Sequence, residues 1–545
     1  MAKMNVQDDY NDSCLLSLEM DSPYYYVNEE NNKSFKIVLH NKGILISEGY
    51  QLSVWVGDNH NNGIIREEDN YILPNEDVQI VIPISQKRWG DHDYYEFNFS
   101  ICSKYQGKWS NKVLLNTSIM NKRDVTFKLA DIKWHDSGYP PHEMFKGRDT
   151  IVEELKSHYC SNIRYYSYVL YGLSKTGKSS ILHVLKESIE GCELNGLVTT
   201  KVILPLFVDL GEIYGLADEE GNFWNSFIDV IFKQTEDFIS RRRPEVQNTL
   251  VKPKGLSDYL EEMKNLLIHP LFMLDEFSFM KNLIEKRFVN SAFLQYMRHI
   301  SADKDLASFI FVGTYDIKQL IHDPKYNISG AFTYLREPDE PLFSISKKSA
   351  EELINTMKGK LDFSSAAIRN IHKLSGDVPF WIQKLCYNCA VYSIDNNRPV
   401  IGLSELETIV SKMTGESPKT NQNKSIPRMN SGTFKNSQTL SSDTEEMKIV
   451  LTSISYLMKE SKQADDVTFD QIKALWSENG YDITIYNIKE AIDSLCERKT
   501  LTYEDVEEMR YYSFSIDLFR RWWHHEHFVF ELELSTFIKG VNNDT

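Results

Sequence analysis

A glycine-bounded loop is the part of this sequence with the clearest chemistry. It runs from Gly172 to Ser179 with the spacing G-x-x-x-x-G-K-S, between the apolar segment Tyr168–Tyr171 and a helical pattern. The two glycines allow successive backbone N–H groups to point inward at an anion, and the N-terminus of the following helix is partially positive. We therefore predict a phosphate-binding loop, whose ligand-contacting residues are Gly172, Leu173, Ser174, Lys175, Thr176, Gly177, Lys178, Ser179 and Ser180.

Two side chains of this loop have more specific roles. Lys178 would reach the β- and γ-phosphates of a nucleoside triphosphate, and the hydroxyl of Ser179 would hold Mg²⁺. The alternative is a glycine-containing turn that only mimics the spacing. The order strand, loop, helix favours the binding loop, so a nucleoside triphosphate and Mg²⁺ are the expected ligands.

A pair of carboxylates follows the apolar run Pro270–Leu274. A buried parallel strand presents polar side chains at its C-terminal edge. Asp275 is then placed to hold Mg²⁺, and Glu276 to polarise the attacking water. An apolar run that ends in Asp-Glu is a weak signal alone. Together with the upstream phosphate loop it predicts hydrolysis, with Glu276 and Lys178 as the catalytic residues.

Thr314 ends another apolar run, Phe309–Gly313. Its hydroxyl could sense the γ-phosphate from the end of a neighbouring strand. A simple turn residue at a strand end explains the same position almost equally well.

Length and composition limit what these candidates can belong to. A chain of 545 residues is too long for one hydrophobic core, and it predicts about three or four domains. With 41% hydrophobic and 26% charged residues, the composition is that of an ordinary soluble protein. The formal net charge of −17 disfavours long-range attraction to nucleic acid.

The cysteines and the N-terminus indicate a reducing, cytoplasmic setting. Seven cysteines are scattered along the chain, which is not the pattern of a disulfide framework. Cys386-x-x-Cys389 has redox spacing, but its helical context favours packed core thiols over metal or redox chemistry. The polar first residues predict no signal peptide, and no apolar run reaches the roughly 20 residues of a membrane span. We therefore expect a cytoplasmic protein without a membrane partner.

The hydrophobic pattern differs between segments of the chain. Alternating runs such as Ser34–His40 and Tyr50–Val56 predict an all-β immunoglobulin-like sandwich over residues 21–133. Catalytic or metal-ligand spacing is absent there, so we expect a sensing or docking domain for a protein partner. Residues 140–345 alternate strands with helices, which predicts a doubly wound α/β P-loop core with a mostly parallel sheet.

The C-terminal part is predicted to be largely helical. Residues 346–412 are expected to form a helical lid, 413–444 a polar, disordered linker, and 445–530 a winged helix of three helices and a hairpin. Acidic residues outnumber basic ones in the winged helix, which disfavours DNA phosphates and favours protein contact or self-contact. The final helix contains the cluster Phe519–His525 and is expected to pack with its arginines on the exposed side.

Together these segments resemble the STAND branch of AAA-like P-loop ATPases, near the archaeal-type ATPase group. The resemblance covers about residues 140–530 and leaves the N-terminal sandwich outside. It is carried by Phe145-x-Gly147-Arg148, the loop Gly172–Ser179, the strand Leu271–Phe277, Val312–Thr314, Leu374–Phe380 and Leu518–Trp522.

The resemblance implies roles for residues outside the loop. Phe145, Gly147 and Arg148 would lie near the adenine, and Pro379 would close on the base from the lid. In such proteins the nucleotide acts as a switch that fixes the lid and the winged helix relative to the core. A trigger sensed by an appended domain then releases this arrangement or drives self-assembly. Many bacterial members look like signalling or antiviral defence proteins.

Two features depart from the family pattern. The winged helix has no Met-His-Asp motif of the kind that reads the ADP phosphate, so the resemblance does not assign how ADP is sensed. It also identifies no arginine finger beyond the candidates Arg298 and Arg336.

Two other functions compete with the switch. A DNA-associated AAA-like ATPase of the initiator or transposition-regulator kind also joins such a core to a winged helix, although the acidic terminal segment argues against it. The third hypothesis is an interaction scaffold with an inactive nucleotide site, against which the intact Lys178 and Glu276 argue.

Overall fold

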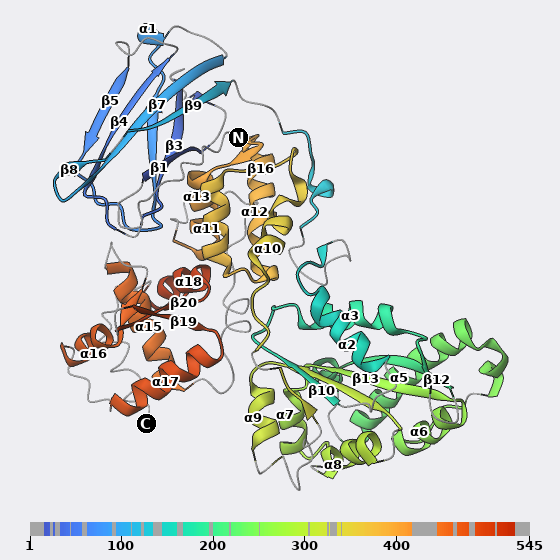
Figure 1. The fold of residues 1–545 in the computed structure, drawn as a ribbon. Helices are drawn as coiled ribbons and strands as arrows, with labels where there is room; N and C mark the ends of the chain where they lie inside the picture. The colour runs from blue at the N-terminus through green and yellow to red at the C-terminus, as the bar shows by residue number, and fades with distance from the viewer. Residues whose placement is uncertain are drawn as a thin grey trace.

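The chain folds into four structured parts, and a central group of helices lies between the other three (Figure 1). This computed structural model describes all residues except 1–15, 22–24, 28–32, 44, 57–62, 90–93, 111, 121–124, 135–143, 161–166, 196–199, 217–219, 250, 291, 304–305, 324–325, 327–334, 339–340, 417–443, 461–465, 479–484, 507–508 and 529–545. The predicted linker 413–444 therefore lies mostly outside the described residues. Among those described, no helix has both the length and the apolar character needed to span a bilayer.

The N-terminal part consists of two antiparallel sheets. In the first, β3 (Lys33–Asn41) pairs with β1 (Leu16–Met20), β2 (Tyr26–Val27) and β6 (Asp77–Pro83). The second has the order β5 (Ile64–Glu68), β4 (Gly49–Val56), β7 (Tyr94–Tyr105) and β8 (Lys108–Trp109), with β9 (Val113–Met120) also paired to β7. A short helix, α1 (Gln86–Trp89), follows β6.

Side chains from both sheets fill one core, which makes this part a β-sandwich. Phe35 of β3 and Phe97 of β7 are fully buried, and their ring centroids lie 4.6 Å apart. Alternate residues of each strand face this core because successive side chains of a strand point to opposite faces. The immunoglobulin-like character of the sandwich stays a prediction.

The second part has a central six-stranded sheet in the order β11-β12-β13-β14-β10-β15. Its neighbouring strands are parallel except for β11, which runs antiparallel to β12. The strands are β10 (Ser167–Tyr171), β11 (Glu193–Asn195), β12 (Thr200–Asp209), β13 (Ile268–Asp275), β14 (Ser308–Gly313) and β15 (Leu335–Arg336). Every residue of β13 is buried, as its continuous apolar run predicts for a central parallel strand.

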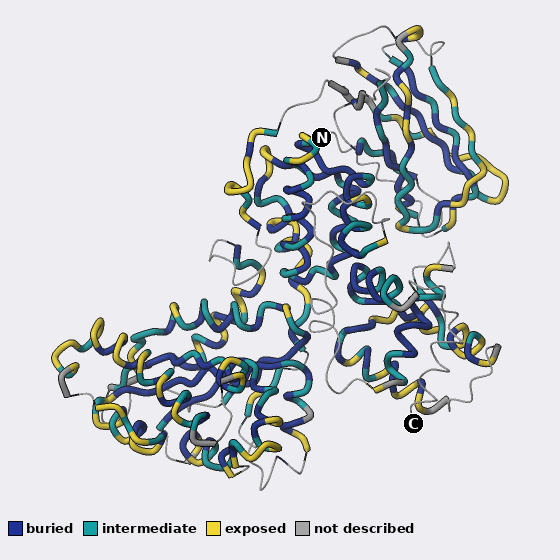
Figure 2. The backbone as a smooth tube through the Cα atoms, turned by 180° about the vertical axis from the view of Figure 1, so that it is seen from behind, coloured by how far each residue is buried: buried dark blue, intermediate teal, exposed yellow. Residues whose placement is uncertain are grey.

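Helices cover both faces of this sheet. Side chains of β10 alternate between two cores: Tyr168 and Leu170 face α2 (Asp149–Tyr159) and α3 (Lys178–Ile189), whereas Val169 and Tyr171 face the opposite helices. The opposite layer contains α4 (Leu210–Leu216), α5 (Glu220–Arg242), α6 (Leu256–Asn265), α7 (Phe279–Glu285), α8 (Ala292–Arg298) and α9 (Asp316–His322). Figure 2 shows the buried strands running between these more exposed helices. The predicted mixed α/β fold with a mostly parallel sheet is confirmed and is consistent with a P-loop NTPase core.

Two mainly helical parts, named here the lid and the winged helix after the predictions, follow the nucleotide core. The lid consists of α10 (Lys347–Ile354), α11 (Ser365–Ser375), α12 (Pro379–Asn396) and α13 (Leu403–Thr414), with the short parallel pair β16 (Asp362–Phe363) and β17 (Val400–Ile401). The winged helix consists of α15 (Glu445–Glu460), α16 (Phe469–Glu478), α17 (Ile485–Glu497) and α18 (Asp517–Phe528), with the strands β18 (Val467–Thr468), β19 (Leu501–Val506) and β20 (Met509–Phe514).

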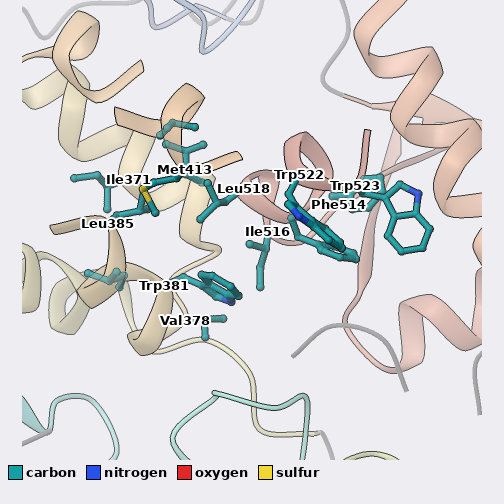
Figure 3. Packing of buried hydrophobic residues seen from close by; sticks show 14 of the residues in the cluster. Ile371, Val378, Trp381, Leu385, Met413, Phe514, Ile516, Leu518, Trp522 and Trp523 are labelled. Atoms are coloured by element: carbon teal, nitrogen blue, oxygen red, sulfur yellow. The ribbon is translucent and has the colours of Figure 1, made fainter. Parts of the chain in front are cut away.

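One apolar core joins the lid to the winged helix. Val378 and Trp381, at the start of α12, belong to the same cluster as Ile516 and Trp522 (Figure 3). Ile516 directly precedes α18, and Trp522 lies within it. Gly376 makes this approach possible, because a Cβ at that position would overlap the carbonyl oxygen of Ser515. Its φ of +56° also belongs to the left-handed region that favours glycine.

The expectation that the arginines of the last helix are exposed is wrong. Arg521 donates to Glu407 of α13 at 2.8 Å and to Glu416 at 2.6 Å, and Arg520 donates to Asp517 at 2.5 Å. Only 14% of the Arg521 side chain is exposed. Apolar residues of α18 face the shared core. The side of the helix that carries Arg521 lies against the lid, so Arg521 is not exposed to solvent. Helical periodicity alone does not reveal the second contact.

The sandwich docks on the lid through a buried carboxylate. Asp21 accepts hydrogen bonds from the backbone N–H of Leu403 at 2.7 Å and from the hydroxyl of Ser364 at 3.2 Å, at the first turns of α13 and α11. Gln79 of the sandwich donates to the same carboxylate at 2.7 Å. Helix N-termini favour a negative charge, but burial dominates and raises the pKa of Asp21 to about 6.

A second group of charges lies beside Asp21 in this interface. Arg369 of α11 donates to Glu19 at 2.9 Å and to Asp77 at 2.7 Å. Asp77 is also within 3.0 Å of the His40 ring nitrogen. The contacts to His40 and Arg369 outweigh burial and lower the pKa of Asp77. The sandwich is therefore held against the lid mainly by specific polar pairs.

We predict that Arg369→Ala loosens the sandwich from the lid without unfolding either part. Glu19 and Asp77 would lose their shared cation, which costs about 1–3 kcal/mol of docking free energy for a pair that is partly solvated. Hydrogen exchange should become faster at the first turns of α11 and α13. The matched control is Arg88→Ala, which removes an exposed arginine that donates to the sandwich backbone at Gly63. Equal exchange in the two variants would contradict the prediction.

Candidate nucleotide-binding site

The predicted phosphate loop connects β10 to α3. Its two glycines are favoured for different structural reasons. A Cβ on Gly172 would overlap the carbonyl oxygen of Leu342, because the segment that leads to the lid crosses the loop there. Leu342 also donates its N–H to the carbonyl of Tyr171 at 2.6 Å. Gly177 instead has open space around its Cβ position but a φ of +92°, which favours glycine at the start of α3.

Lys178 lies folded against its own loop. Its Nζ donates to the carbonyl oxygens of Leu173 at 2.7 Å and Gly172 at 3.1 Å. Thr176 Oγ1 also donates to Leu173, at 2.9 Å, and fixes the loop. Burial lowers the pKa of Lys178 to about 8, and the nearby Glu276 and Asp275 counteract this effect. A phosphate oxygen would suit this ammonium better than two neutral carbonyls.

Ser179 and Asp275 meet as the motif predicts. The Ser179 hydroxyl is hydrogen-bonded to the Asp275 carboxylate, which also accepts the backbone N–H of Glu276 at 2.9 Å. Burial raises the pKa of Asp275 despite these bonds. A hydroxyl and a carboxylate are oxygen ligands of the kind that Mg²⁺ prefers, so this donor set fits the expected ion.

Glu276 is held in an unusual backbone conformation. Its φ is +51°, a region that costs free energy for residues other than glycine and that is enriched at functional sites. The next residue, Phe277, donates its N–H to Val312 of β14 at 2.7 Å, which fixes the turn. Burial raises the pKa of Glu276, whereas Lys178 lowers it. The side chain is thus a half-buried carboxylate close to Lys178.

A third carboxylate, Asp209, lies at this edge of the sheet and was not among the predicted residues. Strand register places Asp209 of β12 opposite Asp275 of β13. Asp209 accepts the N–H groups of Gly211 at 2.8 Å and Glu212 at 3.1 Å in the first turn of α4, and its charge helps to raise the pKa of Glu276. The sequence contains a signal for it, since Val202–Asp209 is also an apolar run that ends in a carboxylate.

Thr314 follows β14 and meets the segment after β13. Its N–H donates to Ser278 Oγ at 3.1 Å, and the two hydroxyl oxygens lie 3.0 Å apart. The structure thus places Thr314 close to the Asp275–Glu276 turn. Its proposed sensing of the γ-phosphate stays a prediction.

The residues assigned to the base by resemblance lie between the loop and the lid. Arg148 is buried and donates through Nη2 to the carbonyls of Phe343 at 2.6 Å and Thr176 at 3.3 Å. Burial lowers the pKa of this guanidinium to about 10. Gly147 has a φ of +73°, and a Cβ there would lie 2.8 Å from Ser349 of α10. Phe145 packs against the core shared by α2 and α3.

The first turn of α12 reaches the phosphate loop. Pro379 begins this helix, as predicted, and the ring of the next residue, Phe380, lies 4.4 Å from Nζ of Lys175. Burial lowers the pKa of Lys175, and the positive charge of Lys384 on the same helix adds to this. Phe380 and Lys384 were not among the predicted site residues. Only the tertiary structure brings them to the loop.

The two arginine-finger candidates are not brought to the loop. Arg336 pairs with Glu154 at 2.8 Å and lies in register with Tyr168, at the end of β10 that is distant from Gly172. Arg298 belongs to α8, in the helical layer on the other side of the sheet from α2 and α3. Neither arginine therefore serves the site of its own chain in this arrangement.

The described residues contain no cluster of three or more metal-ligating side chains. Cys386 and Cys389 are fully buried on α12, and burial raises the pKa of both thiols. They are core thiols, as predicted.

Comparison with solved structures finds distant likenesses. No protein-family model and no curated protein sequence matches the chain. A Walker-type ATPase of Pyrococcus abyssi is 12% identical, with 73% of this chain and 99% of that chain covered at a TM-score of 0.44. The ORC2 protein of Aeropyrum pernix, in ADPNP–ADP complexes, is 11% identical over 72% of this chain and 97% of its own, with a TM-score of 0.41. Cdc6p of Pyrobaculum aerophilum is 14% identical over 72% and 96%, with a TM-score of 0.31.

We predict that Asp275→Asn weakens Mg²⁺-dependent nucleotide binding. The amide keeps the size of the side chain but removes the charge that a divalent cation needs. In isothermal titration, ATP affinity with Mg²⁺ should fall about tenfold or more, the loss of roughly one charge-assisted contact. Affinity in EDTA should stay unchanged. Asp229→Asn, at an exposed ion pair on α5, is the control. Wild-type affinity for Mg·ATP in Asp275→Asn would contradict the assignment.

Proposed function

We propose that this protein is an ATP-binding and ATP-hydrolysing molecular switch of the P-loop class, in which nucleotide controls domain arrangement and self-assembly. The observation that carries the proposal is the meeting of the loop residues Lys178 and Ser179 with Asp275 and Glu276 at the end of β13. Side chains that could bind phosphate, hold a cation and act as a base thus lie close together in one partly buried region. A turn that only mimics the loop would not need these carboxylates.

Each side chain has a distinct part in the proposed reaction. Lys178 and the N–H groups at the start of α3 bind the phosphates. Ser179 and Asp275 would hold Mg²⁺, which supplies charge stabilisation to the phosphoryl group when it is bound. Glu276 orients the attacking water and accepts its proton. Burial lowers the pKa of Lys178. A bound phosphate would place a negative charge beside this ammonium and so stabilise its charged form.

The contacts of the lid support a switch. Its α12 touches the loop through Phe380 and Lys175, and Arg148 joins the loop to the segment that leads into the lid. The same lid binds the sandwich through Asp21 and the winged helix through Arg521. A nucleotide that repositions α12 would therefore move the sandwich and the winged helix together.

The winged helix also contacts the core next to Thr314. Glu497, at the end of α17, accepts hydrogen bonds from the hydroxyl of Tyr315 and from Lys318 Nζ, the latter at 3.1 Å. The bond from Tyr315 is the main cause of the lowered pKa of Glu497. Tyr315 directly follows the proposed γ-phosphate sensor. We infer that this contact holds the winged helix in the resting arrangement and that ATP weakens it.

The setting of the switch follows from the resemblance alone. We propose bacterial signalling or antiviral defence, with the N-terminal sandwich as the docking site for a protein partner. Its attachment to the lid by polar pairs such as Asp77–Arg369 supports a sandwich that can be released.

A DNA-associated AAA-like ATPase is the second candidate. The winged helix after a nucleotide core favours it, whereas the acidic chain and the use of Glu497 of α17 for an internal contact oppose it. A gel-shift titration at rising salt distinguishes the two. Tight binding that falls steeply with salt would favour the DNA function.

We predict opposite defects in two variants of the site. Lys178→Ala should weaken ATP binding about 100-fold, since a buried charge-assisted contact is lost. Glu276→Gln should keep ATP affinity and lower turnover about 10²–10⁴-fold, the usual contribution of a general base. Equilibrium dialysis and phosphate release measure the two effects, with Lys264→Ala on the exposed side of α6 as the control. Unchanged ATP binding in Lys178→Ala would exclude the proposed function.

We further predict that Glu497→Ala favours ATP-driven self-assembly. The variant removes the partner of Tyr315 and Lys318, and an exposed pair of this kind contributes less than about 1 kcal/mol. The ATP concentration at half-assembly, measured by mass photometry, should fall about two- to fivefold. Glu504→Ala, on the exposed strand β19, is the control. Identical midpoints in the two variants would exclude a role of Glu497 in the resting state.

A further inference from the structure

Cys160 and Cys192 bring two thiols together at one end of the nucleotide core. Cys160 caps the C-terminus of α2, and Cys192 lies just beyond the C-terminus of α3. Both side chains are partly buried against the apolar core that these helices share. The Cys192 thiol is close enough to Cys160 to raise its pKa, and Cys192 Sγ also lies 4.0 Å from the carbonyl oxygen of Ser188. They are therefore neighbours in space although they are distant in sequence.

The backbone fixes both cysteines. The N–H of Cys160 donates to the carbonyl of Lys156 at 2.8 Å. The N–H of Cys192 donates to Ile189 at 3.0 Å, and its carbonyl accepts from Ile203 of β12 at 3.0 Å. Both residues therefore have a fixed backbone at the ends of two packed helices, and both side chains lie against the same apolar core.

We propose that Cys160 and Cys192 form a redox-modification site that a hydroperoxide converts into an intramolecular disulfide. The thiolate of Cys192 attacks the peroxide, which breaks the O–O bond and gives a sulfenic acid and an alcohol. The Cys160 thiol loses its proton and attacks the sulfenyl sulfur, which forms the S–S bond and releases water. Two thiols and one hydroperoxide give one disulfide, one alcohol and one water. The two sulfur atoms lose the two electrons that reduce the peroxide.

The surroundings of Cys160 suit the second step better than the first. Burial, followed by the hydrogen bond with Cys192, raises the pKa of Cys160 to about 12, and Lys156 acts weakly in the opposite direction. A protonated thiol reacts slowly with free peroxide. Beside a sulfenic acid, its effective concentration is high enough for the reaction to proceed.

The described residues contain another cysteine pair, which solvent oxidants cannot reach. Cys386 and Cys389 are 0% exposed in the lid core, where an oxidant from solution does not reach them. Cys102 lies buried in the sandwich, away from the nucleotide core. Cys496 is partly buried on α17, in the core shared by the lid and the winged helix. Among these described cysteines, only Cys160 and Cys192 are two partly accessible thiols close to each other, so peroxide should form an intramolecular disulfide there.

The disulfide would tie together the two helices that build the nucleotide site. α2 begins after Arg148, and α3 begins at Lys178. A cross-link between residues 160 and 192 shortens the free chain in the unfolded state, so it should stabilise the core against heat. This effect does not depend on the proposed ATPase activity.

The experiment treats the full-length protein with hydrogen peroxide, blocks the remaining thiols with iodoacetamide and identifies the cysteine peptides by mass spectrometry. The expected product is one peptide pair that joins Cys160 to Cys192, with a loss of two free thiols. The melting temperature should rise by several degrees and fall back on addition of dithiothreitol. Cys160→Ser and Cys192→Ser should lack both effects, and the control Cys102→Ser should keep them.

Three results would contradict the proposed redox-modification site. The first is oxidation of Cys192 to the sulfinic acid while Cys160 stays a thiol. The second is a disulfide between other cysteines. The third is the absence of reaction at both residues under conditions that oxidise methionine on the same protein. Melting of the untreated serine variants near the wild-type temperature verifies that they fold.

Discussion

One continuous apolar core determines which parts of this molecule can move together. Trp134, in the connection from the sandwich, Trp381 of the lid and Trp522 of the winged helix are all fully buried in it. In the described residues, the contacts between this unit and the nucleotide core include the polar pair Lys318–Glu497 and the ring of Phe380 beside Lys175. Exposing apolar surface costs far more than exchanging polar contacts with water. The weakest boundary therefore lies between the nucleotide core and the unit of lid and winged helix. A nucleotide-driven motion would occur at this boundary.

The sandwich is attached by a different kind of interface. Asp21, Asp77 and Arg369 are charged groups removed from water, and their mutual attraction is largely offset by the loss of hydration. Such contacts specify one orientation because every donor needs its acceptor, but they add little net strength. Both surfaces also remain polar when separated. These properties suit a docking domain that is to be released, whereas the lid and the winged helix behave as one unit.

The candidate nucleotide site has an unbalanced charge. Asp209, Asp275 and Glu276 lie at one edge of the sheet. Lys178 offsets the two carboxylates of the turn, and Lys175 adds to its effect on Glu276. Burial raises the pKa of Asp275 and Glu276 and lowers that of Lys178, so each charged form is disfavoured. A bound cation and a phosphate would relieve both effects, which explains why the same side chains serve for binding and for the proposed reaction.

The sequence alone determines the loop Gly172–Ser179, the turn Asp275–Glu276 and the mixed α/β core, because these depend on local spacing and on continuous apolar runs. It does not determine the position of Asp209 opposite Asp275, the partners of Arg521 or Glu497, or the closeness of Cys160 to Cys192. Each of these is a contact between segments that are far apart in sequence, and it depends on strand order and on the position of the lid. Periodicity indicates which face of a helix is apolar. Only the tertiary structure decides what covers the other faces.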